Sequence, residues 1–212
     1  CLANFLNSMG AKVYGAGTDT IRIIGVDSLK STSLSPIPDR IEAGTYMVIG
    51  ALCGGEIEIT NVVIEHIRPI IAKFKECGIK VVEDENNIKI YSSDKIKATD
   101  IKTLPYPGFP TDMQAQMSAM LTVAKGTSMI IETIFENRFL HVGELVKMGA
   151  NIKVEGRVAI IEGVKKLVGT KTKAKDLRGA AALLIAGLVA EGITEIEDIE
   201  HIDRGYFEIE KN

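Results

Sequence analysis

Arginine is the residue type whose placement in this sequence could do chemistry. Of seven arginines, Arg40 and Arg178 lie just after aspartates that are expected to begin apolar helices, and Arg68, Arg138 and Arg204 are expected to begin helices of a second type. A cation at a helix N-terminus opposes the helix dipole by roughly 0.3–1 kcal/mol, whereas an anion held between the two is attracted by both. Guanidinium also binds carboxylate and phosphate bidentately. We therefore expect these five arginines to form a basin for a multiply charged anion.

Local ion pairing is the simpler interpretation of the same arginines. The pairs would be Arg40 with Asp39 or Glu42, Arg138 with Glu136, and Arg204 with Asp203. The arginines would then only cap and pair, and the chain would be a non-catalytic, anion-binding repeat scaffold. The residues alone leave both interpretations open.

The segment Leu104–Gln116 holds a candidate catalytic carboxylate. Leu104–Pro110 contains three of the six prolines and predicts a stiff loop, after which Thr111 and Asp112 open a helix. A carboxylate at the end of a rigid loop could act as a general base or bind sugar hydroxyls. The alternative is that Asp112 is a helix N-cap, as Asp39 and Asp176 are expected to be.

Metal and cofactor chemistry find no support in the sequence. His66, His141 and His201 lack the spacing of metal ligands, and the chain has neither a phosphate-binding loop nor a dinucleotide glycine fingerprint. The expectation is therefore no metal and no cofactor.

Composition excludes several classes of protein. The 212 residues carry 25 Lys+Arg against 28 Asp+Glu, a net charge of −3, which disfavours nucleic-acid binding. Hydrophobic residues make up 46%, too many for disorder, yet no apolar run reaches the length of a membrane span. Three cysteines, Cys1, Cys53 and Cys77, make a disulfide framework improbable and favour a cytoplasmic location.

The chain repeats a pattern of helix, glycine, strand, turn and strand. Short helical patterns end at Gly10, Gly78 and Gly149, where glycine suits the left-handed backbone that follows a helix. Alternating segments that predict strands follow each glycine. They are Ala11–Tyr14 and Ile21–Ile24, Ile79–Val82 and Ile88–Tyr91, and Ala150–Val154 and Val158–Ile161.

The apolar helices begin at Asp39, Asp112 or Asp176 and are nearly apolar all round, which predicts burial with sheets outside them. A further strand is expected after each, at Glu56–Thr60, Met129–Glu132 and Thr194–Ile196. The sequence thus predicts an α/β fold of repeated βαβαββ units with pseudo-threefold symmetry. Residues 1–35 would be a partial unit and residues 36–212 the main domain. The helix-like stretch at 205–212 has no stop signal, so we expect a fragment of a longer protein.

Five segments of the chain together resemble one enzyme family. They are Phe109–Gln116 and Glu132–Phe139, and also Pro38–Glu42, Asp176–Arg178 and His201–Tyr206. In their residues and their order they resemble the signatures of the UDP-N-acetylglucosamine 1-carboxyvinyltransferase family of enolpyruvyl transferases. The related enolpyruvylshikimate-phosphate synthases share the repeat fold but differ at Phe109–Gln116.

This resemblance implies an inside-out α/β barrel and a reaction. The enolpyruvyl group of phosphoenolpyruvate would pass to the 3′-hydroxyl of UDP-N-acetylglucosamine, with release of phosphate, as the first committed step of peptidoglycan biosynthesis. By resemblance, Asp112 is the general base and Ile134 contacts the sugar nucleotide. Arg138, Arg178 and Arg204 bind phosphoenolpyruvate, with Arg40 as possible support, and Glu136 lies near the reacting carbon.

The chain departs from the family in extent. The family's reactive cysteine lies on the other domain, and Cys1, Cys53 and Cys77 do not occupy that motif. Residues 1–35 would belong to the N-terminal catalytic domain, whose remainder is the expected partner. We therefore expect the chain alone to be inactive. A relative that acts on another acceptor stays open as an alternative.

Overall fold

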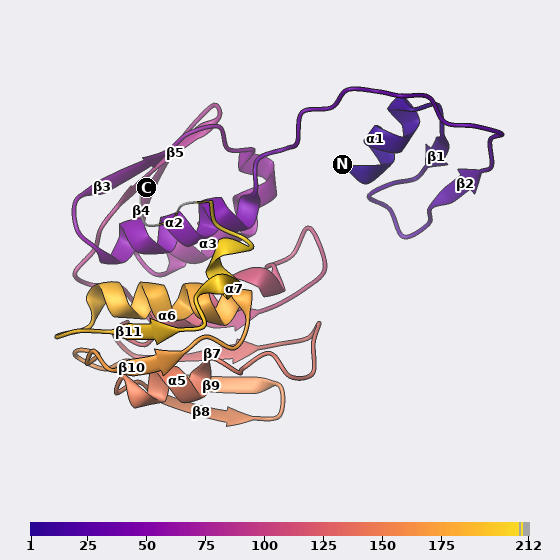
Figure 1. Ribbon diagram of the computed structural model, residues 1–212. Coiled ribbons are helices and arrows are strands. Elements are labelled where there is room, and N and C mark those ends of the chain that lie inside the picture. Colours follow the sequence, from indigo (N-terminus) through magenta and orange to yellow (C-terminus); the bar gives the residue numbers. More distant parts are fainter. Residues whose placement is uncertain (208, 210–212) are drawn as a thin grey trace. The chain divides into compact units, whose positions relative to one another are not determined.

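The structure is a computed structural model that describes residues 1–207 and 209. Its contacts divide the chain into two compact units, Cys1–Pro38 and the remainder from Asp39 onward (Figure 1). Within the described residues, no helix has the length and apolar character needed to cross a membrane.

The first unit is a helix followed by a hairpin. Helix α1 (Leu2–Ser8) precedes the antiparallel strands β1 (Lys12–Tyr14) and β2 (Arg22–Ile24). The Asn7 amide holds the first strand, because its Nδ2 donates to the Val13 carbonyl and its Oδ1 accepts from the Val13 amide, each at 2.8 Å. Val13 is the one buried residue of Cys1–Pro38. The unit therefore has almost no core of its own.

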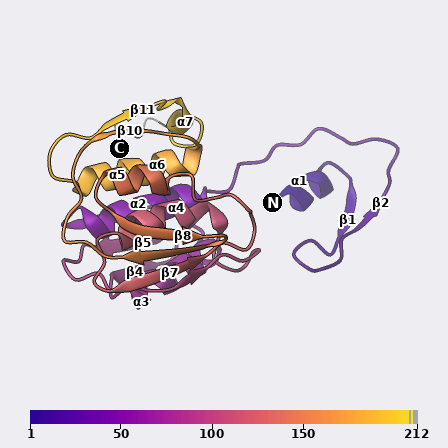
Figure 2. The same cartoon turned by 90° about the horizontal axis from the view of Figure 1, so that it is seen from below.

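Three apolar helices form the centre of the second unit. Helix α4 (Gln114–Leu121) packs on α6 (Leu177–Val189), and α2 (Arg40–Leu52) packs on both (Figure 2). Every residue of α4 is buried, as are most of those in α2 and α6. The predicted burial of these helices is confirmed.

Each central helix covers its own sheet. Helix α2 packs on the antiparallel sheet β3-β5-β4, and α4 packs on β7 and β9 of the sheet β6-β7-β9-β8. Helix α6 lies on β11, which pairs in parallel with β10. The strands are β3 (Glu56–Ile59), β4 (Lys80–Asp84), β5 (Asn87–Tyr91), β6 (Ile101–Lys102), β7 (Thr127–Ile131), β8 (Asn151–Glu155), β9 (Val158–Glu162), β10 (Lys171–Lys173) and β11 (Glu195–Glu197).

The remaining helices are α3 (Ile64–Glu76), α5 (Val142–Lys147) and α7 (Glu200–Asp203). The glycines that follow α3 and α5, Gly78 and Gly149, have φ values of 78° and 93°, so the predicted left-handed turns are confirmed.

The repeat of elements is confirmed as well. The run β6–α4–β7–α5–β8–β9 is one complete βαβαββ unit. Before it, α2–β3–α3–β4–β5 has the order of a unit without its first strand, and after it comes β10–α6–β11–α7. The strand order β3-β5-β4 recurs as β7-β9-β8. These elements establish a mixed α/β fold built from repeated units.

Four helix boundaries differ from the predictions. Asp112 lies inside a 3-10 turn, η1 (Thr111–Met113), and caps no helix. Arg68 lies within α3, Arg138 lies in the loop before α5, and Arg204 follows the end of α7, so none of the three begins a helix. Of the helix expected at 205–212, residues 205–207 form turns and bends, and 208 and 210–212 lie outside the described residues.

Candidate functional site

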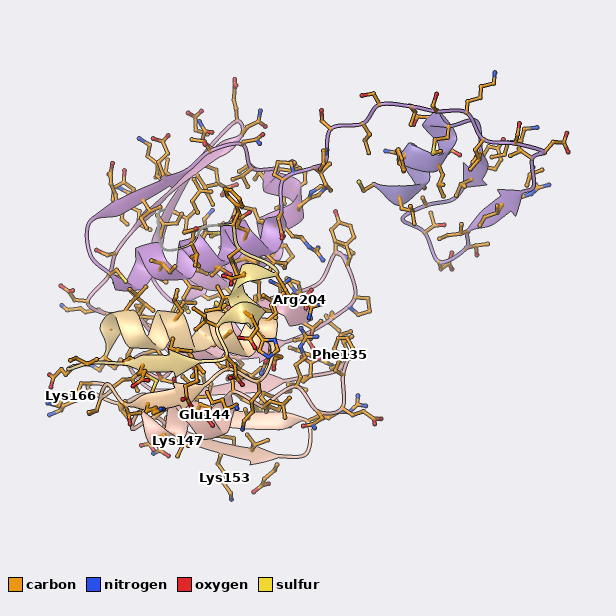
Figure 3. All side chains as sticks on the ribbon, viewed as in Figure 1. Phe135, Glu144, Lys147, Lys153, Lys166 and Arg204 are labelled. Carbon is orange, nitrogen blue, oxygen red and sulfur yellow. The ribbon has the colours of Figure 1, made fainter. Side chains whose placement is uncertain are left out.

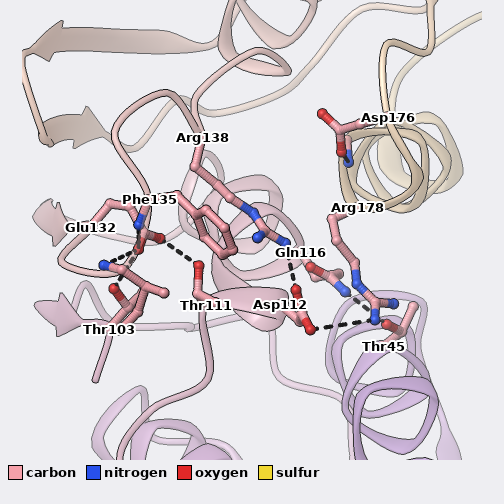
Figure 4. A network of polar contacts seen from close by, with 12 residues as sticks. Thr45, Thr103, Thr111, Asp112, Gln116, Glu132, Phe135, Arg138, Asp176 and Arg178 are labelled. Atoms are coloured by element: carbon pink, nitrogen blue, oxygen red, sulfur yellow. Dashed lines mark hydrogen bonds and ion pairs between the residues drawn. The ribbon is translucent and has the colours of Figure 1, made fainter. Parts of the chain in front are cut away.

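The Asp112 carboxylate lies between two guanidinium groups (Figure 4). Arg138 Nη2 donates to Asp112 Oδ1 at 2.5 Å, and Arg178 Nη2 lies 3.7 Å from Oδ2. The arginine side chains are mostly buried, with 21% and 15% exposed, whereas the Asp112 side chain is 42% exposed. The carboxylate is therefore held by both arginines and still reaches solvent.

The helix starts around this cluster explain why Asp112 is available. Asp39 accepts the Ile41 amide at 2.7 Å, and Asp176 Oδ1 accepts the Gly179 amide at 2.8 Å, so both cap their helices. Asp112 makes no such bond, because η1 is bounded by Pro110 and forms no side-chain cap. Of the two interpretations of Asp112, the helix-cap interpretation is wrong.

The cluster lines a cavity of about 350 Å³. Its lining residues are Asp112, Asn137, Arg138, Leu140, Asp176, Leu177 and Arg178. Paired guanidinium groups suit an anionic ligand, and an accessible carboxylate beside them can accept a proton from that ligand's partner. The arrangement therefore suits proton transfer next to a bound anion.

A buried carboxylate shapes the loop that carries Arg138. Glu132 is fully buried and accepts the hydroxyls of Thr103 and Thr111 at 2.9 and 2.8 Å. It also accepts the backbone amides of Ile134 and Phe135 at 2.8 and 3.2 Å (Figure 4). Glu132 thus ties the loop after β7 to the turn that holds Asp112.

The ring of Phe135 lies against the Arg138 guanidinium, whose Cζ is 4.6 Å from the ring centroid. Ile134 and Phe135 are 38% and 48% exposed, so both present apolar surface to solvent. This loop therefore adds an apolar face beside the charged cluster.

Two of the five expected arginines meet at Asp112, and the others do not. Arg68 pairs with Glu65 and Glu83 on the surface, so its expected place in the basin is wrong. Arg40 stacks over the Tyr106 ring, with Cζ 5.3 Å from the centroid. Arg204 forms no ion pair among the residues described, and lies at the same end of the unit as Phe135 (Figure 3).

The alternative of local pairing is also wrong in its details. None of the pairs expected for Arg40, Arg138 and Arg204 is formed within the described part of the chain. Glu136 pairs instead with Arg157 at 3.1 Å, and its side chain is 88% exposed. Glu136 therefore lies outside the Asp112 cluster.

His141 is a buried imidazole beside the same cluster. It is 2% exposed, and burial lowers its pKa to about 4, an effect that Asp176 opposes and Arg138 reinforces. The side chain is therefore neutral at pH 7 and adds no charge to the cavity.

Three residues escaped prediction as members of the site. Tyr206 and Thr45 are buried and form a polar contact with each other, and Gln116 of α4 donates to both. Gln116 is a polar side chain within an apolar helix, and Gln116 and Tyr206 both end segments that carry the family resemblance.

A second cavity of about 350 Å³ lies beside Pro69, Ile101 and Phe109 and contains none of the predicted site residues. Among the residues that the structure describes, no group of three or more His, Cys, Asp or Glu side chains could hold a metal ion.

Comparison with known proteins gives the family. The model of the family described as EPSP synthase (3-phosphoshikimate 1-carboxyvinyltransferase) matches residues 1–212. UDP-N-acetylglucosamine 1-carboxyvinyltransferase 1 of Caldanaerobacter subterraneus subsp. tengcongensis is 62% identical over 210 residues, which are 99% of this chain and 51% of the relative. UDP-N-acetylglucosamine 1-carboxyvinyltransferase of Desulfofundulus thermocisternus is 54% identical, over 99% of this chain and 87% of the relative.

A solved structure shares the fold. The enolpyruvyl transferase NikO of Streptomyces tendae superposes with a TM-score of 0.84 at 27% identity, over 94% of this chain and 48% of that one. The chain spans about half the length of most of the curated relatives it matches. It belongs to the EPSP synthase family, and within it to the UDP-N-acetylglucosamine 1-carboxyvinyltransferases.

Proposed function

We propose that this chain is half of an enzyme that transfers the enolpyruvyl group of phosphoenolpyruvate to the 3′-hydroxyl of UDP-N-acetylglucosamine. The observation that carries the proposal is the Asp112 carboxylate, partly exposed in a cavity between Arg138 and Arg178. Phosphoenolpyruvate carries a carboxylate and a phosphate, which are the two groups that guanidinium binds best. The relatives at 54–62% identity bear the name of this transferase.

In the proposed reaction, Asp112 accepts the proton of the sugar hydroxyl as that oxygen bonds to C2 of phosphoenolpyruvate. A proton from solvent adds at the methylene carbon and makes C2 electrophilic, so the addition gives a tetrahedral intermediate. The C2–O bond to phosphate then breaks, phosphate leaves with the proton that Asp112 accepted, and the methyl carbon returns its proton to solvent. Arginines held in place beforehand stabilise the charge of this intermediate without reorganisation.

The other site residues take the roles that the family resemblance implies. Arg204 contributes a third guanidinium for phosphoenolpyruvate, and Arg40 supports it. Ile134 contacts the sugar nucleotide through its backbone, which the Glu132 carboxylate fixes. Glu136 lies near the reacting carbon in the proposed complex, which requires its surface pair with Arg157 to open.

The proposal extends to the architecture. The units that follow Asp39 form an inside-out α/β barrel with pseudo-threefold symmetry, in which α2, α4 and α6 are the three inner helices. Helix α1 with β1 and β2 has the order of the last elements of a βαβαββ unit. We infer that residues 1–35 belong to an N-terminal domain, and that this domain completes the active site in the cytoplasm.

A hybrid enzyme tests the function. In it, this chain replaces the matching half of the Caldanaerobacter relative, and phosphate release is measured with phosphoenolpyruvate and UDP-N-acetylglucosamine. We expect turnover that requires both substrates, and Asp112→Asn should lower kcat by about 10²–10⁴-fold, the contribution of a general base. The exposed Asp94→Asn is the matched control. Retained turnover in Asp112→Asn would remove Asp112 as the base.

Calorimetry on the same hybrid separates binding from a scaffold role. We expect Arg178→Ala and Arg138→Ala to weaken phosphoenolpyruvate binding. Unchanged affinity in both variants would favour the non-catalytic scaffold. If the hybrid releases phosphate in the presence of another hydroxylated acceptor but not in the presence of UDP-N-acetylglucosamine, the result would favour a relative that acts on that other acceptor.

A further inference from the structure

A single phenolic hydroxyl connects the three central helices. Tyr206 is 2% exposed, and its hydroxyl lies 2.9 Å from Thr45 Oγ1 of α2. Gln116 Nε2 of α4 lies 3.4 Å from the same hydroxyl, and so does Nη1 of Arg178, the second residue of α6. Each inner helix therefore sends one polar side chain to the same oxygen.

The direction of each hydrogen bond follows from the donors present. Arginine has no acceptor, so Arg178 must donate to the Tyr206 oxygen. The Tyr206 proton is then free to go to Thr45 Oγ1, and the Thr45 hydroxyl donates in turn to the Ile41 carbonyl at 2.9 Å. Gln116 Nε2 also donates to Thr45 Oγ1, at 3.1 Å. The chain of bonds from Arg178 to the backbone of α2 thus has one consistent order.

This order fixes one end of the Arg178 guanidinium. Nη1 donates to the Tyr206 hydroxyl. Nη2 faces Asp112 Oδ2 at 3.7 Å (Figure 4). A guanidinium is planar and rigid, so holding Nη1 sets the direction in which Nη2 points. The aromatic ring of Tyr206 is held separately, by packing in a cluster with Ala174, Ala180, Ala181 and Ile202.

We propose that Tyr206 is a positioning residue that aims Arg178 at Asp112 and at the bound anion. The inference rests on the proposed function, and the sequence signatures assign no such role to Tyr206. Thr45 and Gln116 act through it, because they hold its hydroxyl in the orientation that accepts from Arg178. The hydroxyl thus serves the alignment of charge in the cavity, while the ring serves the packing.

Removing the hydroxyl alone tests the proposal in the hybrid enzyme. Tyr206→Phe keeps the ring and its packing, and we expect kcat/KM for phosphoenolpyruvate to fall about tenfold, which corresponds to about 1.4 kcal/mol. KM for UDP-N-acetylglucosamine should change less. Thr172→Val is the matched control, because Thr172 is also buried but donates to the Glu195 carbonyl, away from the cavity.

A double-mutant cycle distinguishes positioning from a loss of stability. If Tyr206 acts through Arg178, Tyr206→Phe should cost little further activity in an Arg178→Lys background, because the fork to be aimed is gone. Equal losses in both backgrounds would overturn the proposal. If the unsubstituted hybrid is active and Tyr206→Phe has the same kcat/KM for phosphoenolpyruvate, the proposal would also be overturned. A hybrid that does not turn over even unsubstituted would instead count against the proposed function, and calorimetry of phosphoenolpyruvate binding to Tyr206→Phe would then decide the positioning role.

A second pair of variants keeps the test independent of the folding of Tyr206→Phe. Thr45→Val removes the acceptor of the Tyr206 proton and should lower kcat/KM in the same direction. Thr45→Ser keeps the hydroxyl and should recover most of that loss. An equal effect of valine and serine would contradict the proposed bond order.

Discussion

At the scale of single residues, Glu132 is the side chain on which the site loop depends most. Its carboxylate accepts four hydrogen bonds in a fully buried position. Glu132→Gln leaves only one accepting oxygen, and an unsatisfied buried polar group costs about 1–3 kcal/mol. We expect the free energy of unfolding to fall by about that amount in urea denaturation of the chain.

The same variant should affect binding. Because Glu132 fixes the Ile134 amide, Glu132→Gln should raise KM for the sugar nucleotide in the hybrid enzyme. Glu162→Gln is the matched control, since its carboxylate accepts an exposed bond from Asn151. Equal stability of the two variants would contradict the role of Glu132.

His141 predicts how stability depends on pH. Burial lowers its pKa from 6.5 to about 4, so between these values the unfolded chain binds a proton that the folded chain does not. The free energy of unfolding therefore keeps its full value, as far as His141 is concerned, above pH 6.5. It decreases as the pH falls from 6.5 towards 4. At about 1.4 kcal/mol per pH unit, the loss amounts to about 3 kcal/mol.

Urea denaturation at pH 7.5 and pH 4.5 checks this expectation. His141→Asn should lose less stability than the wild type between the two pH values, because the asparagine does not titrate. An identical loss in both proteins would show that other groups cause the acid sensitivity.

Sequence reasoning at this scale reached Asp112, Arg138 and Arg178 but placed Arg68 with them. The loops that join β3 to α3, β7 to α5 and β11 to α7 differ in length, and this explains the wrong placement of Arg68. They span residues 60–63 before α3, 132–141 before α5 and 198–199 before α7. Arginines at similar intervals along the chain therefore fall inside a helix, in a loop or after a helix. Loop length is set by tertiary packing, which residue spacing does not report.

At the scale of secondary-structure elements, Gly163 follows the last residue of β9 and lies against the backbone of Ala124, shortly after the end of α4. A Cβ at Gly163 would lie 1.6 Å from the Ala124 carbonyl oxygen. The Gly163 amide donates to the Gly126 carbonyl at 3.0 Å. Gly163→Ala must therefore move one backbone away from the other. We expect a loss of about 2 kcal/mol or more in the free energy of unfolding, a typical cost of strain in a packed region.

Gly143 provides the control. It lies in α5, and a Cβ there would meet nothing within 4 Å. Gly143→Ala should be neutral or stabilise the chain by up to about 1 kcal/mol, because alanine favours helix. Similar unfolding midpoints for the two alanine variants would show that the contact at Ala124 relaxes freely.

Elements were easier to predict than site residues. The buried helices and alternating strands follow from apolar periodicity, and the glycines at 78 and 149 mark the ends of their helices. The turn η1 could not be predicted, because its aspartate resembles the caps at Asp39 and Asp176 in sequence. Only the three-dimensional path after Pro110 separates a capping aspartate from an accessible one.

At the scale of the whole molecule, the first unit, Cys1–Pro38, has almost no buried core of its own. Val13 is its one buried residue, whereas Ile21, Ile23 and Leu29 are 59%, 69% and 46% exposed. Burying such side chains stabilises a fold by about 25 cal/mol per Å² of apolar surface. We expect amides of residues 1–38 to exchange hydrogen rapidly in the isolated chain and slowly in the hybrid enzyme.

Hydrogen exchange followed by mass spectrometry measures both states. Amides of α2, α4 and α6 provide the internal control, because these helices are buried in the chain itself. Slow exchange in residues 1–38 of the isolated chain would contradict the proposal that this unit belongs to another domain.

The unequal use of three comparable aspartates has a wider consequence. Asp39 and Asp176 accept backbone amides at the start of their helices, whereas Asp112 forms no such hydrogen bond. A protein built from repeated units can separate structural and catalytic roles in this way. Two units keep the capping aspartate that stabilises the helix, and the third unit uses its aspartate for another function. New chemistry can then arise at a single copy without dismantling the architecture that the other two sustain.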